Sequence, residues 1–166
     1  WTSLSISGYP TYSISGNKHV YGPSGISDIY DSYEGPSYTT GIFTFEYGLN
    51  FNRVFSLGID AGFCPYWGTM HSGYTGEVTS KRFGCNIFVM PEAHLAYINR
   101  KFFRFFGTIG LGISLQVGDC PLDIPVLPMF QINPVCVEYG NKWFVLARLG
   151  VGTEFLGGKV GFGYRF

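Results

Sequence analysis

The chain has 166 residues, a length that fits one domain and is short for two, so we expect a single domain over residues 1–166. Eleven Lys plus Arg balance eleven Asp plus Glu, and this balance lacks the positive field that nucleic-acid binding needs. Charged residues make up only 13% of the chain, whereas aromatic residues reach 19% and glycine occurs 24 times. Soluble domains usually carry about twice this share of charge, which argues against an ordinary water-facing surface.

Apolar and polar residues alternate along most of the chain, and this period of two predicts strands rather than helices. The most apolar run, residues 105–117, is interrupted by glycines and cannot form the roughly 20-residue apolar helix that spans a membrane. The fold class is therefore predicted to be all-β, with eight strands. In chain order they cover residues 4–14, 39–51, 55–67, 84–97, 102–117, 127–139, 143–154 and 160–166.

The strand predicted at residues 39–51 has the clearest alternation. Phe43 and Phe45 share one face and Glu46 lies on the other, whereas Ile42 is the one apolar exception on the polar face. The strands that follow repeat this pattern. Each predicted strand therefore has one apolar face and one polar face.

Five prolines fall inside predicted strands, where each removes one hydrogen-bond donor from the ladder. They are Pro10, Pro65, Pro91, Pro128 and Pro134. At Pro134 the apolar residues also change phase, from even positions such as Ile132 to odd positions such as Val135. This change predicts a β-bulge at Pro134, and the other prolines predict a locally irregular wall.

The predicted connections differ in length in a regular order. The first, residues 16–35, is long, whereas turns near residues 50–53, 99–101 and 140–142 are short and share one end of the strands with both termini. A last tight turn is predicted at residues 157–158. This order is typical of an antiparallel up-and-down transmembrane β-barrel, and most strands reach the roughly 9 to 11 residues that cross a bilayer.

The polar face of the strands is assigned to the barrel interior. All five lysines are expected in loops or at strand ends, whereas the water-facing wall of a lipocalin-like barrel would be rich in lysine. The few strand charges have mixed sign and suit a narrow interior where carboxylates and guanidiniums pair. We interpret them as a salt-bridged plug, with a general base or pH switch at His94 as the alternative. The predicted interior network comprises Glu46, Asp60, Glu92, His94, Arg104, Arg148, Glu154 and Arg165.

The apolar face carries aromatic residues near strand ends, including Trp67, Trp143 and Tyr139, as in the aromatic girdles of membrane barrels. The chain closes on an alternating series with a terminal Phe: Val160, Phe162, Tyr164 and Phe166. With these features the whole chain resembles the small eight-stranded outer-membrane β-barrels of Gram-negative bacteria, the class of the OmpA membrane domain and OmpX. The resemblance implies a location in the bacterial outer membrane, contact with outer-membrane lipid, and recognition of the final series by the barrel-insertion machinery.

Residues capable of catalysis or metal binding show no diagnostic spacing. The four cysteines lack both a CxxC motif and a nearby histidine, so we expect neither a metal site nor a cofactor. His71 and Ser72, beside Trp67, are the best candidates for a catalytic site at the outer rim that acts on lipid or peptide. Eight strands enclose too little space for a wide channel, which leaves a narrow pore as a further alternative.

Contact through the loops or the outer wall is the function that remains. Tyrosines in loops bury large area at modest entropic cost when they meet a partner. We therefore expect a non-enzymatic barrel that acts as a structural or interaction protein. The narrower form of this expectation is an accessory subunit of a larger outer-membrane protein complex. The candidate contact residues are Tyr21, Tyr30, Tyr33, His71 and Tyr74.

Overall fold

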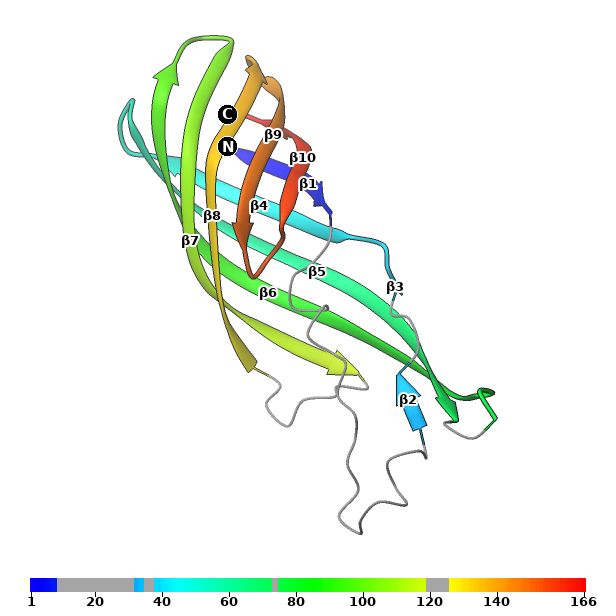
Figure 1. The fold of residues 1–166 in the computed structure, drawn as a ribbon. Coiled ribbons are helices and arrows are strands. Elements are labelled where there is room, and N and C mark those ends of the chain that lie inside the picture. The colour runs from blue at the N-terminus through cyan, green and yellow to red at the C-terminus, as the bar shows by residue number, and fades with distance from the viewer. Residues whose placement is uncertain (9–31, 35–37, 73–74, 119–125) are drawn as a thin grey trace.

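Antiparallel strands form a closed barrel in the computed structural model of the protein, which describes residues 1–8, 32–34, 38–72, 75–118 and 126–166 (Figure 1). Eight strands make the ring, and β1 pairs with β10 to close it, which confirms the predicted all-β, eight-stranded antiparallel up-and-down barrel. Two short strands, β2 and β3, pair with β5 beyond the end of β4. None of the described segments forms a helix that is long and apolar enough to cross a membrane. The strands are β1 (Thr2–Ser7), β2 (Ser32–Glu34), β3 (Tyr38–Thr39), β4 (Ile42–Asn50), β5 (Phe55–Ser72), β6 (Val78–Asn99), β7 (Phe103–Gly118), β8 (Val126–Gly140), β9 (Trp143–Gly152) and β10 (Gly157–Tyr164).

The two faces of the barrel wall differ in polarity, because successive side chains of a strand point to opposite sides. In β4, Phe43, Phe45 and Tyr47 are exposed on the outside, whereas Thr44 and Glu46 are buried inside. Buried and exposed positions also alternate along most of β5, β6, β7, β8 and β9. The exterior of the ring is therefore apolar, and the interior holds most of the charged side chains of its strands.

The short turns lie at one end of the barrel, together with both termini (Figure 1). They connect β4 to β5 at residues 51–54, β6 to β7 at residues 100–102, and β8 to β9 at residues 141–142. The backbone amide of Arg165 donates to the carbonyl oxygen of Lys142, which ties the end of the chain to the last of these turns. We call this the turn end and the opposite end the loop end.

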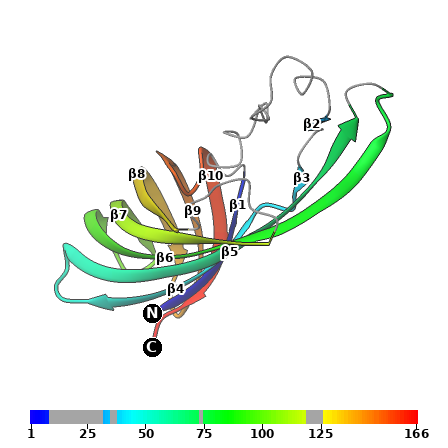
Figure 2. The same ribbon diagram turned by 90° about the horizontal axis from the view of Figure 1, so that it is seen from below.

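The barrel wall is tall on one side and short on the other. β5 and β6 have 18 and 22 residues, whereas β1 and β10 have 6 and 8. β4 pairs with β5 only as far as Phe63, and β7 pairs with β6 only as far as Gly84. Beyond these points residues 67–72 and 78–83 project past the ring as the β5–β6 ribbon (Figure 2).

Two predicted details are wrong. The connection between β9 and β10 lies at residues 153–156 rather than at residues 157–158. Lys159 lies inside β10 and Lys81 inside β6, whereas lysines were expected only in loops or at strand ends. Lys159 is tolerated inside a strand because its ammonium group forms ion pairs in the interior. The later part of the first predicted strand, residues 9–14, falls outside the described residues.

The predicted bulge at Pro134 is confirmed, because the β8–β9 register shifts between Ile132 and Val135. The other prolines of the described strands keep a regular pairing on at least one side. The wall is therefore more regular at those prolines than predicted, and Pro10 lies outside the described residues.

Candidate functional site

A group of ionisable side chains fills the middle of the barrel interior. Each exposes at most 2% of its surface. They meet because each occupies an inward position of the two-residue repeat on a different part of the ring. The group comprises Glu46 from β4, Asp60 from β5, Glu92 and His94 from β6, and Arg148 from β9.

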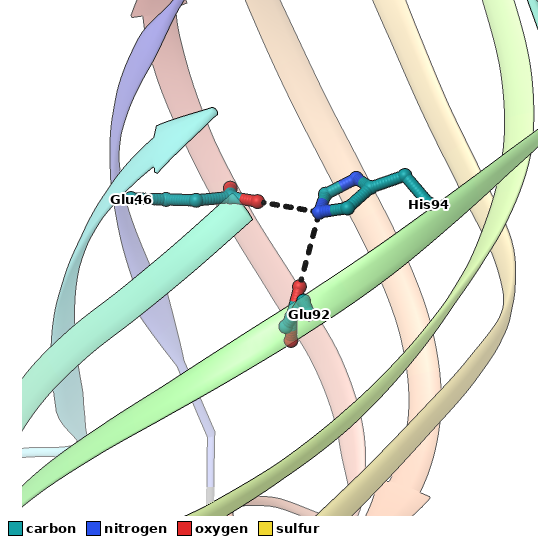
Figure 3. A group of neighbouring side chains, drawn as sticks. All are labelled: Glu46, Glu92 and His94. Atoms are coloured by element: carbon teal, nitrogen blue, oxygen red, sulfur yellow. Dashed lines mark ion pairs between the residues drawn. The ribbon is translucent and has the colours of Figure 1, made fainter. Parts of the chain in front are cut away.

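Arg148 joins carboxylates from two strands across the interior. Its Nη2 donates to Glu46 Oε2 at 2.5 Å, and its Nη1 donates to Glu92 Oε2 at 3.0 Å. His94 Nε2 lies 3.1 Å from Glu46 Oε1 and 3.6 Å from Glu92 Oε2 (Figure 3). We call Glu46, Glu92, His94 and Arg148 the central group.

Lys159 supplies the second buried cation, next to the central group. Its Nζ donates to Asp60 Oδ2 and, at 3.0 Å, to Glu154 Oε1. Asp60, Glu92 and Glu154 each offer a carboxylate oxygen, and these oxygens lie within 4.8 Å of one another. The ion-pair network therefore continues from the central group to the connection between β9 and β10.

A separate set of ion pairs lies at the turn end. Glu138 Oε2 accepts hydrogen bonds from Arg165 Nη2 and, at 3.5 Å, from Arg104 Nη1. Arg104 Nη2 also donates to Ser56 Oγ at 3.4 Å. Glu138 is absent from the interior network predicted from the sequence, although the phase change at Pro134 is the signal that its side chain points inward.

Apolar side chains pack on both sides of the central group, so the interior is filled rather than open. The His94 ring lies between the rings of Trp1 and Phe106, at centroid distances of 5.3 Å and 5.6 Å. Trp1 also belongs to a buried cluster with Phe144 and Leu146. A second cluster explains the apolar Ile42 on the inward face and consists of Ile42, Cys64, Phe88, Met90, Met129 and Phe155.

The predicted contact residues are only partly placed. Three fall outside the described part of the chain: Tyr21, Tyr30 and Tyr74. Tyr33 lies in β2, where its backbone pairs with that of His71. His71 Nε2 lies 3.0 Å from Thr69 Oγ1, and its Nδ1 lies 2.9 Å from the Gly76 carbonyl oxygen. Both ring nitrogens of His71 are therefore engaged within the ribbon and its connection.

The C-terminal series faces outward from the barrel. Val160, Phe162 and Phe166 are exposed, and Tyr164 is half-buried. The Tyr164 ring packs against Trp143 at a centroid distance of 5.0 Å. The series thus forms part of the outer apolar wall beside the turn end.

Two triads of interior side chains have ligand atoms close enough together to hold a metal ion. In one, the atoms of Glu46, Glu92 and His94 lie within 4.8 Å of one another, and in the other those of Asp60, Glu92 and Glu154 do. The expectation of no metal site rested on cysteine spacing, which does not test carboxylate and imidazole ligands. In the second triad, the ammonium group of Lys159 already bridges two of the carboxylates.

No family model, curated protein or solved structure matches the chain. The interior can stabilise the barrel wall through buried ion pairs, or it can bind a cation. The apolar exterior can pack against lipid or against another apolar surface.

Proposed function

We propose that this protein is a bacterial outer-membrane barrel, similar to the OmpA membrane domain and OmpX class, that serves as a non-enzymatic structural or interaction subunit. The inverted polarity of its wall is the observation that supports this most strongly. The outward side chains are apolar and highly exposed, as in Leu111 at 68%, Trp143 at 68% and Tyr139 at 65%. The charged groups of the same strands are buried inside. Such a wall suits hydrocarbon rather than water.

The dimensions of the wall also support a membrane crossing. β4 and β9 have 9 and 10 residues, close to the roughly 9 to 11 that a tilted strand needs to cross a bilayer. Trp143 and Tyr139 lie beside the turn end, where aromatic side chains anchor a barrel at the membrane interface. The outward C-terminal series is the segment we propose for recognition by the insertion machinery.

The packed interior supports a structural role rather than conduction. Arg148 bridges carboxylates of β4 and β6, and Lys159 bridges Asp60 of β5 to Glu154 in the connection before β10. Phe106 and Phe155 are fully buried beside them. We therefore propose that the network braces the barrel, while the outer surface carries the function.

An apolar groove on the outer wall supports contact with another outer-membrane protein. The groove crosses β9, β10, β1, β4 and β5, has a volume of about 660 Å³, and is lined by residues that include Ile6, Phe43 and Phe162. A depression of this size receives a ridge of apolar side chains from a neighbouring protein more readily than a smooth wall does. The β5–β6 ribbon offers a second contact, since Phe83 is exposed there.

Photocross-linking in intact cells tests the proposal. A photoreactive amino acid is placed at Phe43 in the groove, at Phe83 in the ribbon, and at Leu111 across the ring as the control. We expect a cross-linked protein of discrete mass from Phe43 or Phe83 and only lipid from Leu111. Lipid or solvent alone at all three positions would overturn the partner, and solubility without detergent would overturn the membrane placement.

Two further measurements separate the proposal from its alternatives. Loss of lipid or peptide turnover on His71→Ala would replace it with an enzyme at the outer rim. Steady conductance of the reconstituted barrel in a planar bilayer would replace it with a narrow pore. We expect neither turnover nor conductance.

A further inference from the structure

We propose that Glu46, Glu92 and His94 bind a divalent transition-metal ion of the Zn²⁺ type inside the barrel. Imidazole nitrogen and carboxylate oxygen are ligands that Zn²⁺ and its neighbours accept together, whereas Mg²⁺ and Ca²⁺ prefer oxygen alone. Glu46 projects from β4 and the other two residues from β6, so closure of the ring creates the site.

The geometry of His94 carries this proposal. Its imidazole points between the two carboxylates, with Nε2 at 3.1 Å from Glu46 Oε1 and 3.6 Å from Glu92 Oε2 (Figure 3). His94 Nε2 and Glu46 Oε1 are buried and lie within hydrogen-bond distance of each other, and no third group in the described part of the chain forms a hydrogen bond with either atom. Two ligands bound at about 2.0 to 2.2 Å to one ion lie about 2.8 to 3.6 Å apart at tetrahedral or octahedral angles. Both distances from His94 Nε2 fall in this range, and the ligand oxygens of Glu46 and Glu92 lie within 4.8 Å of each other.

The charge of the surrounding residues supports a divalent ion independently. If all four carboxylates of the set are ionised and His94 is neutral, two negative charges stay uncompensated among groups that are almost fully buried, and such burial is costly. A proton on His94 compensates one of them, whereas a divalent ion compensates both. The set contains four carboxylates and two permanent cations: Glu46, Asp60, Glu92, Glu154, Arg148 and Lys159.

The residues around the triad hold its ligands in place. Arg148 binds both carboxylates through Oε2, which leaves Oε1 of Glu46 directed at His94 and holds Glu92 Oε2 between Arg148 and His94. The rings of Trp1 and Phe106 fix the plane of the imidazole. Outer partners that orient ligating side chains in this way are a regular feature of protein metal sites.

Burial of the triad determines how the ion enters and how the site is tested. Because the three side chains expose at most 2% of their surface, we expect the ion to be captured while the barrel closes. The barrel is therefore refolded from urea into detergent with Co²⁺ or Zn²⁺, and loosely bound ion is removed with a chelator. Metal content is measured by mass spectrometry, and the Co²⁺ protein is also measured by visible absorption.

We expect one ion per wild-type chain, and a loss of at least tenfold in retained ion on His94→Gln. His71→Gln is the matched control, since it makes the same substitution in the projecting ribbon, and it should retain the ion. Glu138→Gln should retain the ion as well, because Glu138 belongs to the set at the turn end.

Absence of a stoichiometric ion from the refolded wild-type barrel would overturn the proposal, as would equal retention by the His94→Gln variant. If His94→Gln fails to fold, Glu46→Gln and Glu92→Gln replace it under the same criterion. Electron spin-echo measurements on Cu²⁺-loaded His71→Gln protein provide a readout that needs no change in the triad. The expected signal is one coordinated imidazole, and its absence contradicts the site.

Discussion

Arg148 reaches across the barrel from β9 to carboxylates on β4 and β6. A buried charge is tolerated only when its partners are also present, because each partner alone would face a low-dielectric interior without compensation. Replacement of one member of such a set therefore costs more than the net contribution of the set to stability. This asymmetry makes single substitutions a sensitive test of the interior network.

We expect Arg148→Met to lower the free energy of unfolding by about 3 to 5 kcal/mol, because Glu46 and Glu92 would stay buried without their guanidinium group. Met retains an unbranched apolar stem close to Phe106, over which the guanidinium now lies at 5.7 Å. The loss therefore reports mainly on charge. It is measured by urea unfolding in detergent micelles.

Arg53→Met is the matched control, because Arg53 lies exposed in the turn between β4 and β5. It should change the free energy of unfolding by no more than about 0.5 kcal/mol. Adding Glu92→Gln to Arg148→Met should recover part of the loss. If Arg148→Met and Arg53→Met have equal stability, the ion pairs do not brace the barrel.

At the scale of the strands, the two-residue repeat of the sequence is sufficient to predict where most strands lie and which of their side chains point inward. The alternation of apolar and polar residues is a property of each strand alone and does not depend on the neighbouring strands. The inward positions of Glu46 and Arg148 therefore follow from the sequence. Their contact does not follow, because these residues are 102 positions apart and meet only through closure of the ring. For the same reason the metal-like spacing of Glu46 with His94 has no sequence signal.

The turn between β9 and β10 shows where the repeat fails. The glycines at 157–158 resemble a hairpin turn, but Glu154 and Phe155 are buried and draw the connection into the interior. Gly157 instead begins β10 with a φ of 115°, a conformation that favours glycine. Three-dimensional packing thus overrides a local turn signal. Because the predicted turn lay next to Lys159, the sequence placed this lysine at a strand end and did not predict its position in the interior.

We expect Gly161→Ala to destabilise the barrel by about 1 to 3 kcal/mol, because the new methyl group overpacks the seam between β10 and β1. Its Cβ would lie 2.3 Å from the Leu4 carbonyl oxygen and 2.5 Å from Ser5 Cβ, so β1 would have to move. Urea unfolding in micelles measures the loss.

Gly158→Ala, in the same strand, is the control for this prediction. Its Cβ would approach no atom closer than 3.8 Å, and its backbone does not have a positive φ. It should leave stability unchanged or raise it by about 0.4 to 1 kcal/mol, because alanine restricts the unfolded chain. Equal destabilisation by both variants would contradict close packing at the seam.

For the whole molecule, the proposed membrane placement predicts that the cost of an outward charge depends on its depth. Leu111 lies in the middle of β7, and Leu111→Arg should cost about 2 to 4 kcal/mol in lipid vesicles. Phe83→Arg, on the ribbon beyond the ring, should cost about 0 to 1 kcal/mol. Unfolding of both variants in vesicles gives the comparison, and equal costs at the two positions would argue against a bilayer around β7.

The pairing of β1 with β10 also has a consequence for how the protein is made. The residues that meet there, from Thr2 with Tyr164 to Ser7 with Lys159, are separated by nearly the whole chain. Until the last strand has been synthesised, the growing sheet has two unpaired edges, which are a template for aggregation. The entropic cost of joining such distant segments also makes closure a late and slow event. The edges of the sheet therefore stay unpaired until residues 2–7 and 159–164 are both available.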